Sequence, residues 1–219
     1  MGERLNFSAV IFDADGTLFD TETLMYEVWV EIGRDMGLTM TIPEYLHYVG
    51  LNRKTVLDVM HERIGPDFDG AEFMVRCVAR LSERIEEEGV PLKPGVREIL
   101  APLQEKGIPV GLATSTHRVR TDRRLALCGL GKYFAAVVTG DEVSKGKPDP
   151  EIYRAVCQKL GFSPENCLAV EDSKNGILSA YQAGLAVAMI PDMVPPTAEL
   201  EDIAWKTFSS LLELRDHFA

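Results

Sequence analysis

Short apolar runs alternate with amphipathic stretches along much of the chain. The apolar runs, each bounded by polar or turn-forming residues, occupy 8–13, 109–115, 135–140, 167–172 and 186–191. The stretches between the later runs have the length and polarity of helices and include 118–129, 149–160 and 174–183. Near-continuous apolar strands that alternate with helices are typical of a parallel sheet covered on both faces. The pattern therefore predicts an α/β fold with a parallel sheet that has helices on both faces.

Residues 21–89 carry a different pattern, in which apolar positions recur with helical spacing and no strand is evident. One such stripe consists of Leu24, Val28, Ile32 and Met36, and a second consists of Met74, Val78, Leu81 and Ile85. Apolar residues at this spacing form one face of an amphipathic helix. We therefore expect a small all-helical domain at 20–89, inserted after the first strand, and a core domain made of 1–19 and 90–219.

Composition narrows the possible partners. The 219 residues carry a formal net charge of −11, with 34 acidic and 23 basic side chains. A surface of this sign repels nucleic acids and anionic membranes, so we expect neither as a partner. The four cysteines are widely spaced and form no paired motif, and the chain does not begin with a signal-like segment. We therefore expect reduced thiols and a cytoplasmic protein.

Polar side chains that suit catalysis follow three of the predicted strands. Asp13 and Asp15 end the first apolar run, Thr114 ends the second, and Asp172 ends the run at 167–172. In open parallel sheets, ligands bind beyond the carboxyl ends of the strands. We therefore expect these side chains, from distant parts of the sequence, to lie at one site.

The chemistry of this set combines a cation site with an anion site. Four carboxylates, from Asp13, Asp15, Glu171 and Asp172, cannot share a site in ionised form without a cation, and hard oxygen ligands favour Mg²⁺. The Thr114 hydroxyl, the amides of the following turn and a lysine in "SKGKPDP" suit an anion. A metal, an anion cradle and spare carboxylates together indicate phosphoryl transfer.

The sequence resembles the haloacid dehalogenase superfamily, in the branch that carries a helical cap after the first motif. "DADGT", "LATS", "GKPDP" and "VEDS" match its four motifs in the expected order, so the resemblance spans nearly the whole chain. It is similar to the phosphatases of this branch that are related to β-phosphoglucomutase and phosphoglycolate phosphatase. The resemblance implies a Rossmann-like catalytic core and a helical cap domain.

The resemblance also implies a role for each residue that matches a motif. Asp13 would be the nucleophile that forms an aspartyl-phosphate, and Asp15 would be the general acid and then the general base. Thr114 and the Ser115 amide would hold the phosphoryl group, and Lys147 would neutralise its charge.

Further residues are expected around this centre. The Mg²⁺ ligands would come from Asp13, Asp15 through its backbone carbonyl, Glu171 and Asp172. Ser173 and Asn175 would support the metal-binding loop by hydrogen bonding. In the cap, "GLNRK" resembles a substrate-contacting loop, and Arg53 is its candidate clamp for a distal group of the substrate.

The resulting prediction is a Mg²⁺-dependent phosphatase that acts on a small phosphorylated metabolite, of sugar-phosphate or nucleoside-monophosphate type, as a monomer or weak oligomer. A β-phosphoglucomutase-type mutase is the alternative, although Met25 stands where those mutases carry a histidine. A non-catalytic binding protein of the same fold is a third possibility, against which the complete motifs argue. Asp15 argues against a dehalogenase, which lacks this second aspartate.

Overall fold

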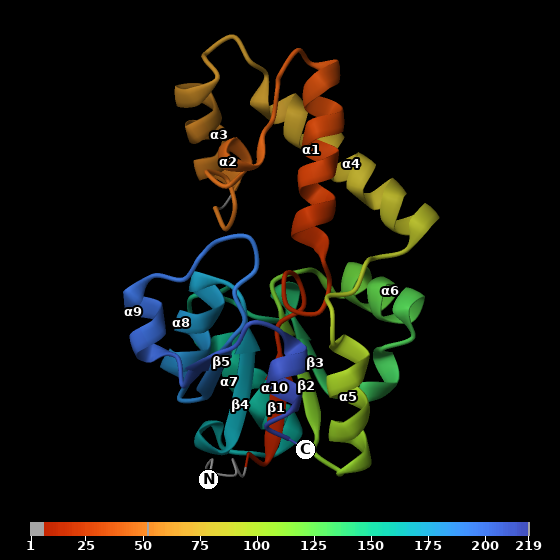
Figure 1. Ribbon diagram of the computed structural model, residues 1–219, viewed down its shortest axis with the longest axis vertical. Helices are drawn as coiled ribbons and strands as arrows, with labels where there is room; N and C mark the ends of the chain where they lie inside the picture. The colour runs from red at the N-terminus through yellow and green to blue at the C-terminus, as the bar shows by residue number, and fades with distance from the viewer. Residues whose placement is uncertain (1–6, 52, 219) are drawn as a thin grey trace. The chain divides into compact units, whose positions relative to one another are not determined.

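A parallel six-stranded sheet in the order β3-β2-β1-β4-β5-β6 organises the larger part of the chain (Figure 1). The computed structural model describes residues 7–51 and 53–218. The strands are β1 Ala9–Phe12, β2 Val110–Thr114, β3 Phe134–Thr139, β4 Cys167–Glu171, β5 Ala186–Met189 and β6 Lys206–Thr207. The predicted α/β fold with a parallel sheet is confirmed, and the two-residue edge strand β6 is an element that the sequence pattern did not indicate.

Helices cover both faces of this sheet. They are α5 Val96–Glu105, α6 Arg118–Cys128, α7 Glu151–Leu160, α8 Lys174–Ala183, α9 Ala198–Ile203 and α10 Leu211–Arg215, with short 3-10 turns η1 Gly131–Tyr133, η2 Gly140–Glu142 and η3 Pro164–Asn166. Helices α7 and α8 pack against alternate residues of β1 to β5, and α10 packs against α5 on the opposite side (Figure 1). Successive side chains of a strand point to opposite sides of a sheet. The central strands are therefore buried on both faces, because helices cover each side.

Two of the helices around the sheet have well-defined capping residues. Ser173 caps α8 by accepting a hydrogen bond from the Gly176 amide at 3.1 Å. Gly161 ends α7 in the left-handed conformation, with φ of +80°, which glycine adopts without steric cost. Ser173 therefore fixes the start of α8 directly after β4, and Gly161 fixes the end of α7 before β4.

The chain forms two compact units, of which the sheet and its helices are the first. It contains the residues up to Asp20 and from Leu92 onward, and the second unit is Thr21–Pro91. The second unit consists of α1 Thr21–Asp35, α2 Ile42–Tyr45, α3 Arg53–Arg63 and α4 Gly70–Glu88. None of the helices among the described residues is long and apolar enough to cross a membrane.

The core of the second unit is centred on aromatic side chains. The Trp29 ring of α1 lies 5.0 Å from the Phe73 ring of α4, with edge-to-face geometry. The buried stripe of α4 therefore runs through Gly70, Phe73, Cys77, Leu81 and Ile85. Of the predicted stripe, Leu81 and Ile85 are buried, whereas Met74 and Val78 are only half-buried, because the buried face of α4 runs through the neighbouring positions Phe73 and Cys77. Met36 lies just beyond the end of α1.

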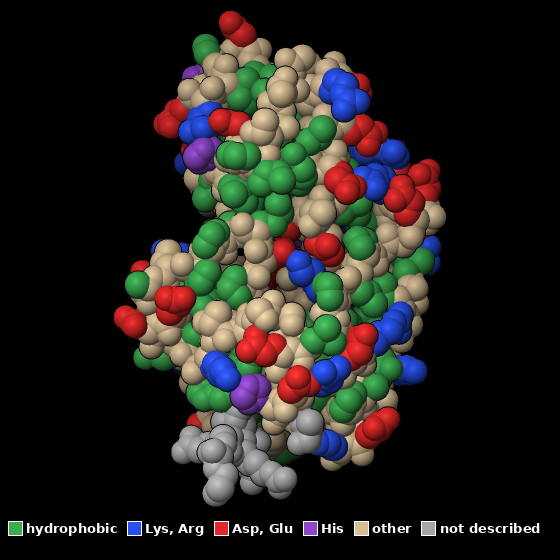
Figure 2. Space-filling view, viewed as in Figure 1, with side chains coloured by type: hydrophobic (Ala, Val, Ile, Leu, Met, Phe, Trp, Pro, Cys, Tyr) green, Lys and Arg blue, Asp and Glu red, His purple; other side chains and the backbone are tan. Residues whose placement is uncertain are grey.

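The exposed sides of α1 and α4 are joined by ion pairs. Arg80 bonds Glu31 at 2.8 Å, and Arg84 bonds Glu27 at 2.8 Å. Figure 2 shows acidic and basic side chains interleaved on this part of the surface. Exposed pairs of this kind contribute about 0–1 kcal/mol each, so the aromatic core is the main source of stability in this unit.

Candidate active site

The carboxyl ends of β1, β2 and β4 bring the predicted residues of the core together. Asp13 follows β1, Thr114 ends β2, and Glu171 ends β4 with Asp172 after it. The Asp13 amide donates to the Val170 carbonyl at 2.9 Å, which continues the sheet pairing to the site itself. Parallel pairing of β1 with both β2 and β4 is therefore what makes these distant residues neighbours.

Gly16 allows the turn after β1 to approach the β4 loop. Its φ is +84°, and a Cβ atom built on it would lie 2.2 Å from Asp172 Oδ2. Any larger residue would displace the Asp172 carboxylate, which also accepts a hydrogen bond from the Thr17 hydroxyl at 3.1 Å. The glycine and threonine of "DADGT" thus set the position of a carboxylate that lies far away in the sequence.

Lys147 is the buried cation of the site. Its Nζ lies 2.5 Å from Asp13 Oδ1, 2.6 Å from Glu171 Oε1 and 3.0 Å from the Ala113 carbonyl oxygen. Only 6% of its side chain is exposed, so water does not screen these contacts. Burial by itself lowers the pKa of Lys147, but the attraction of Asp13 and Glu171 is larger, and the pKa lies above its usual value. The ammonium group is therefore held in the charged form.

Glu171 acts as an acceptor for several protein donors at once. Oε1 accepts from Lys147 and from the Tyr153 hydroxyl, the latter at 2.7 Å. Oε2 accepts from the amides of Asp172 and Ser173 and from the Ser173 hydroxyl, at 3.2–3.3 Å. Gly176 leaves the space, because a Cβ there would lie 1.8 Å from Oε1. Glu171 thereby links the Lys147 ammonium to the loop after β4.

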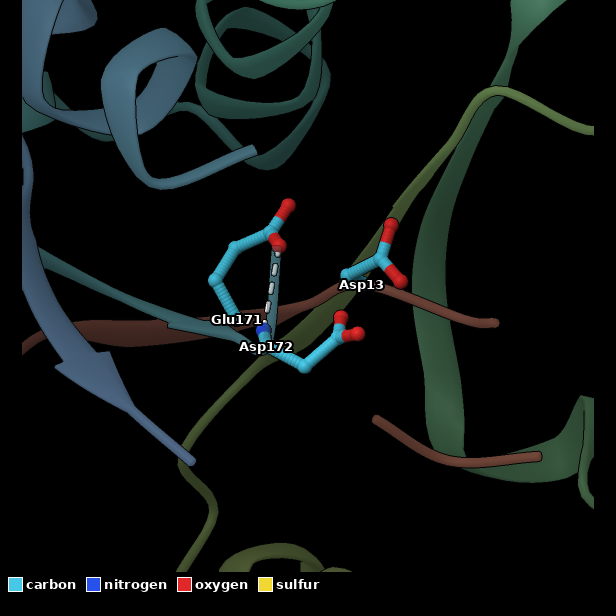
Figure 3. Close-up of side chains that lie close together, drawn as sticks. All are labelled: Asp13, Glu171 and Asp172. Carbon is cyan, nitrogen blue, oxygen red and sulfur yellow. Dashed lines mark hydrogen bonds between the residues drawn. The ribbon is translucent and has the colours of Figure 1, made fainter. Parts of the chain in front are cut away.

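A cation could bind where three carboxylates meet. Asp13, Glu171 and Asp172 each offer an oxygen, and these oxygens lie within 4.8 Å of one another (Figure 3). Burial raises the pKa of Asp172, and the neighbouring Asp13 and Glu171 carboxylates raise it further. Burial likewise raises the pKa of Asp13, although Lys147 opposes the shift. A set of hard oxygen donors whose charges repel one another suits Mg²⁺, which would relieve that repulsion.

The loop after β2 provides the groups predicted to bind an anion. Thr114 is buried, and its hydroxyl oxygen accepts from the Thr116 amide at 3.1 Å. The Ser115 side chain is exposed at the turn. Its backbone lies close to Gly140, where an added Cβ would be 2.3 Å from the Ser115 carbonyl oxygen. The turn is therefore held from the end of β3, with Ser115 at its surface.

Asp15 makes contacts of its own beside the Asp13 cluster. Its Oδ1 lies 2.5 Å from Arg124 Nη1, and its Oδ2 accepts from the Thr116 hydroxyl at 2.7 Å. Arg124, Thr116 and Tyr153 carry no signal in the sequence that marks them as residues of the site. Arg124 stands in a basic helix with nothing to distinguish it from its neighbours, and Tyr153 occupies an ordinary core position of α7. Arg124 and Thr116 contact Asp15, which lies more than a hundred positions earlier in the sequence. Tyr153 contacts Glu171 at the end of β4.

The remaining predicted residues lie in different settings. Ser173 contacts Glu171 as described, whereas Asn175 is exposed on the first turn of α8. Lys145 is exposed on the loop before Lys147 and lies outside the site. Arg53 is exposed at the first residue of α3, in the second unit, and Asn52 of the same predicted loop lies outside the described residues.

Comparison with known proteins adds independent information. Residues 10–190 match the family model described as haloacid dehalogenase-like hydrolase. A phosphorylated carbohydrates phosphatase of Thermotoga maritima is 37% identical over 177 residues, which cover 81% of this chain and 82% of that protein. Hexitol phosphatase B of Escherichia coli is 33% identical over 190 residues, covering 84% and 83%.

A solved structure shows the same similarity in three dimensions. The structure is a hydrolase of the same family from Deinococcus radiodurans, determined with bound phosphate and sodium. It superposes with a TM-score of 0.82 and 26% identity, over 96% of this chain and 94% of that one. The similarity therefore extends over both the strands that carry the site and the inserted helices.

Proposed function

The chain belongs to the haloacid dehalogenase-like hydrolases, and from this premise we propose that it is a phosphatase that hydrolyses small phosphate monoesters with the help of Mg²⁺. The substrate would be a phosphorylated metabolite of sugar-phosphate or nucleoside-monophosphate type. Relatives described as phosphatases of phosphorylated carbohydrates and hexitols favour the first of these classes. In this proposal the sheet unit is the catalytic core, and Thr21–Pro91 is the cap domain.

One observation carries the proposal. The Asp13 carboxylate stands at the end of the central strand, 2.5 Å from a buried ammonium group and beside two further carboxylates. A nucleophile that attacks a phosphoryl group needs a fixed position and neighbouring positive charge. Lys147 provides the charge on one side of Asp13, and the three carboxylates provide a place for a cation.

The residues of the site would divide the reaction into two steps. An Asp13 oxygen would attack phosphorus, and the bond from phosphorus to the ester oxygen would break as that oxygen takes a proton from Asp15. Water would then attack the aspartyl-phosphate while Asp15 accepts its proton, which yields inorganic phosphate and restores Asp13. Lys147, Thr114 and the Ser115 amide would hold the phosphoryl oxygens in both steps.

Mg²⁺, held by Asp13, Asp172 and the Asp15 carbonyl with Glu171 nearby, would supply positive charge against the phosphoryl oxygens. Protein residues orient the carboxylates of the site. Lys147 keeps the Asp13 carboxylate oriented, and the hydrogen bonds from Tyr153 and Ser173 keep Glu171 in place for Lys147.

The test is phosphate release from a panel of phosphorylated metabolites, measured with Mg²⁺ and with EDTA. The Asp13→Asn variant removes the nucleophile, and Asp216→Asn, at an exposed aspartate, is the matched control. We expect Mg²⁺-dependent release that disappears in the Asp13 variant and persists in the control. Consumption of glucose 1-phosphate without free phosphate would support the mutase instead, and release that survives in Asp13→Asn would contradict the proposed nucleophile.

A further inference from the structure

Arg124 is a buried arginine that directly contacts the proposed acid of the reaction. It lies in α6, with 10% of its side chain exposed, and its Nη1 is 2.5 Å from Asp15 Oδ1. The two residues are 109 positions apart in the sequence. Removing an arginine from water is costly unless its charge is paired, so this contact is what makes the burial tolerable.

The surroundings of Arg124 show that the burial is specific. Thr121 and Leu125 of the same helix are buried with it, whereas Arg120 and Arg123 are exposed. Helix α6 therefore turns one arginine of its basic sequence towards the carboxyl end of β1 and leaves others at the surface. The net negative charge of the protein does not explain why Arg124 is buried, because it attracts an exposed arginine just as well.

Asp15 is held at both of its carboxylate oxygens. Arg124 contacts Oδ1, and the Thr116 hydroxyl donates to Oδ2 at 2.7 Å. A carboxylate restrained at two points has one orientation, and each oxygen keeps a further lone pair that can carry a proton. The side chain of Asp15 is still 30% exposed, so it is fixed without being closed off.

We propose that Arg124 is a positioning residue that orients Asp15 for proton transfer to the ester oxygen, an inference that rests on the proposed function. When the phosphorus–oxygen bond breaks, the departing oxygen takes the Asp15 proton and leaves as a neutral alcohol. An alkoxide is a poor leaving group and needs this proton, whereas an aryl oxide departs without it. Arg124 therefore matters for phosphate esters of alcohols, such as sugar and polyol phosphates.

The experiment compares two esters in the full-length protein. One is 4-nitrophenyl phosphate, and the other is the alkyl phosphate that is hydrolysed fastest in the panel above. The parameter is kcat/KM, because it reports the steps up to departure of the leaving group and is independent of the later attack by water. Arg124→Met removes the charge and keeps an unbranched side chain, and Arg120→Met makes the same change at an exposed position of α6.

We expect Arg124→Met to lower kcat/KM for the alkyl phosphate by roughly ten- to a hundredfold, and for the aryl phosphate by less than about threefold. Arg120→Met should change neither value. Thr116→Val removes the other contact with nearly the same shape and should show the same preference for the aryl ester, to a smaller degree. If Arg124→Met does not fold, Arg124→Gln, which also removes the charge but keeps a polar side chain, replaces it in the same comparison.

Equal losses for the two esters would overturn the inference, because a general structural defect lowers both. An unchanged or raised kcat/KM for the alkyl ester would overturn it as well. These outcomes leave the proposed function intact, since the wild-type protein is active in both cases. A wild-type protein that hydrolyses neither ester contradicts the proposed function and, with it, this inference.

Discussion

Replacing Lys147 by methionine should destabilise the sheet unit strongly, and more at high pH than at low pH. The change removes the ammonium group and leaves Asp13 and Glu171 facing each other without it. At an effective dielectric constant of about 20, charges 2.5 Å apart attract by about 7 kcal/mol, and the cost of burying the ammonium offsets much of this. Removing one partner of a buried ion pair costs about 3–5 kcal/mol in net terms.

The pH dependence follows from the carboxylates that remain. Burial already raises the pKa of Asp13, with Lys147 opposing the shift, so loss of Lys147 raises this pKa further. A carboxyl group whose pKa is higher in the folded state contributes stability at low pH, and that contribution is lost as the pH rises through the folded-state pKa. The loss in free energy of unfolding caused by Lys147→Met should therefore be smaller at pH 5 than at pH 8.

The measurement is urea-induced unfolding followed by the fluorescence of Trp205, which lies in the sheet unit beside Phe208. A Trp29→Phe background removes the signal of the other unit. Lys145→Met is the matched control, because Lys145 is exposed on the same loop and pairs with Asp149 only at 3.8 Å.

For a protein of this size, the expected loss corresponds to a fall in Tm of roughly 6–20 °C. The Lys145 control should lose less than about 1 kcal/mol. A Lys147 deficit no larger than that of the control, or one that is the same at pH 5 and pH 8, would refute the reasoning.

Other substitutions test the surroundings of the same carboxylates. Gly176→Ala places a Cβ 1.8 Å from the Glu171 carboxylate and should cost at least about 3 kcal/mol in urea unfolding, whereas Gly146→Ala, with nothing within 4 Å, should change stability by less than about 0.5 kcal/mol. Tyr153→Phe removes one donor to buried Glu171 and should cost about 1–3 kcal/mol by the same measurement; an unchanged midpoint would contradict the hydrogen bond. Mg²⁺ at about 100 times its Kd should stabilise the wild type by about 2.7 kcal/mol, seen as a rise in Tm that EDTA reverses, and Asp172→Asn should lose this rise. A full Mg²⁺ effect in Asp172→Asn would exclude it as a ligand.

Much of the architecture was predictable from local patterns. Apolar runs without alternation indicated strands buried on both faces, and the runs at 109–115 and 167–172 correspond to β2 and β4. Because parallel strands end at one edge of a sheet, the positions of Asp13, Thr114 and Asp172 after such runs were enough to place them near one another. The four motifs also indicated the family, which the comparison confirmed.

Contacts between side chains were decided only by the tertiary structure. The helical pattern of 118–129 indicates which residues are apolar, but not that Arg124 turns inward to meet Asp15, 109 positions away. The stripe of α4 is centred on Phe73 because that ring meets Trp29, and periodicity alone could not choose between adjacent registers. Likewise, Glu171 was recognisable as an acidic residue at a strand end, whereas its hydrogen bonds to Lys147 and Tyr153 depend on the packing of α7 against the sheet. Local sequence thus determined the elements and their ends, while the partners of the buried charges depended on how those elements pack.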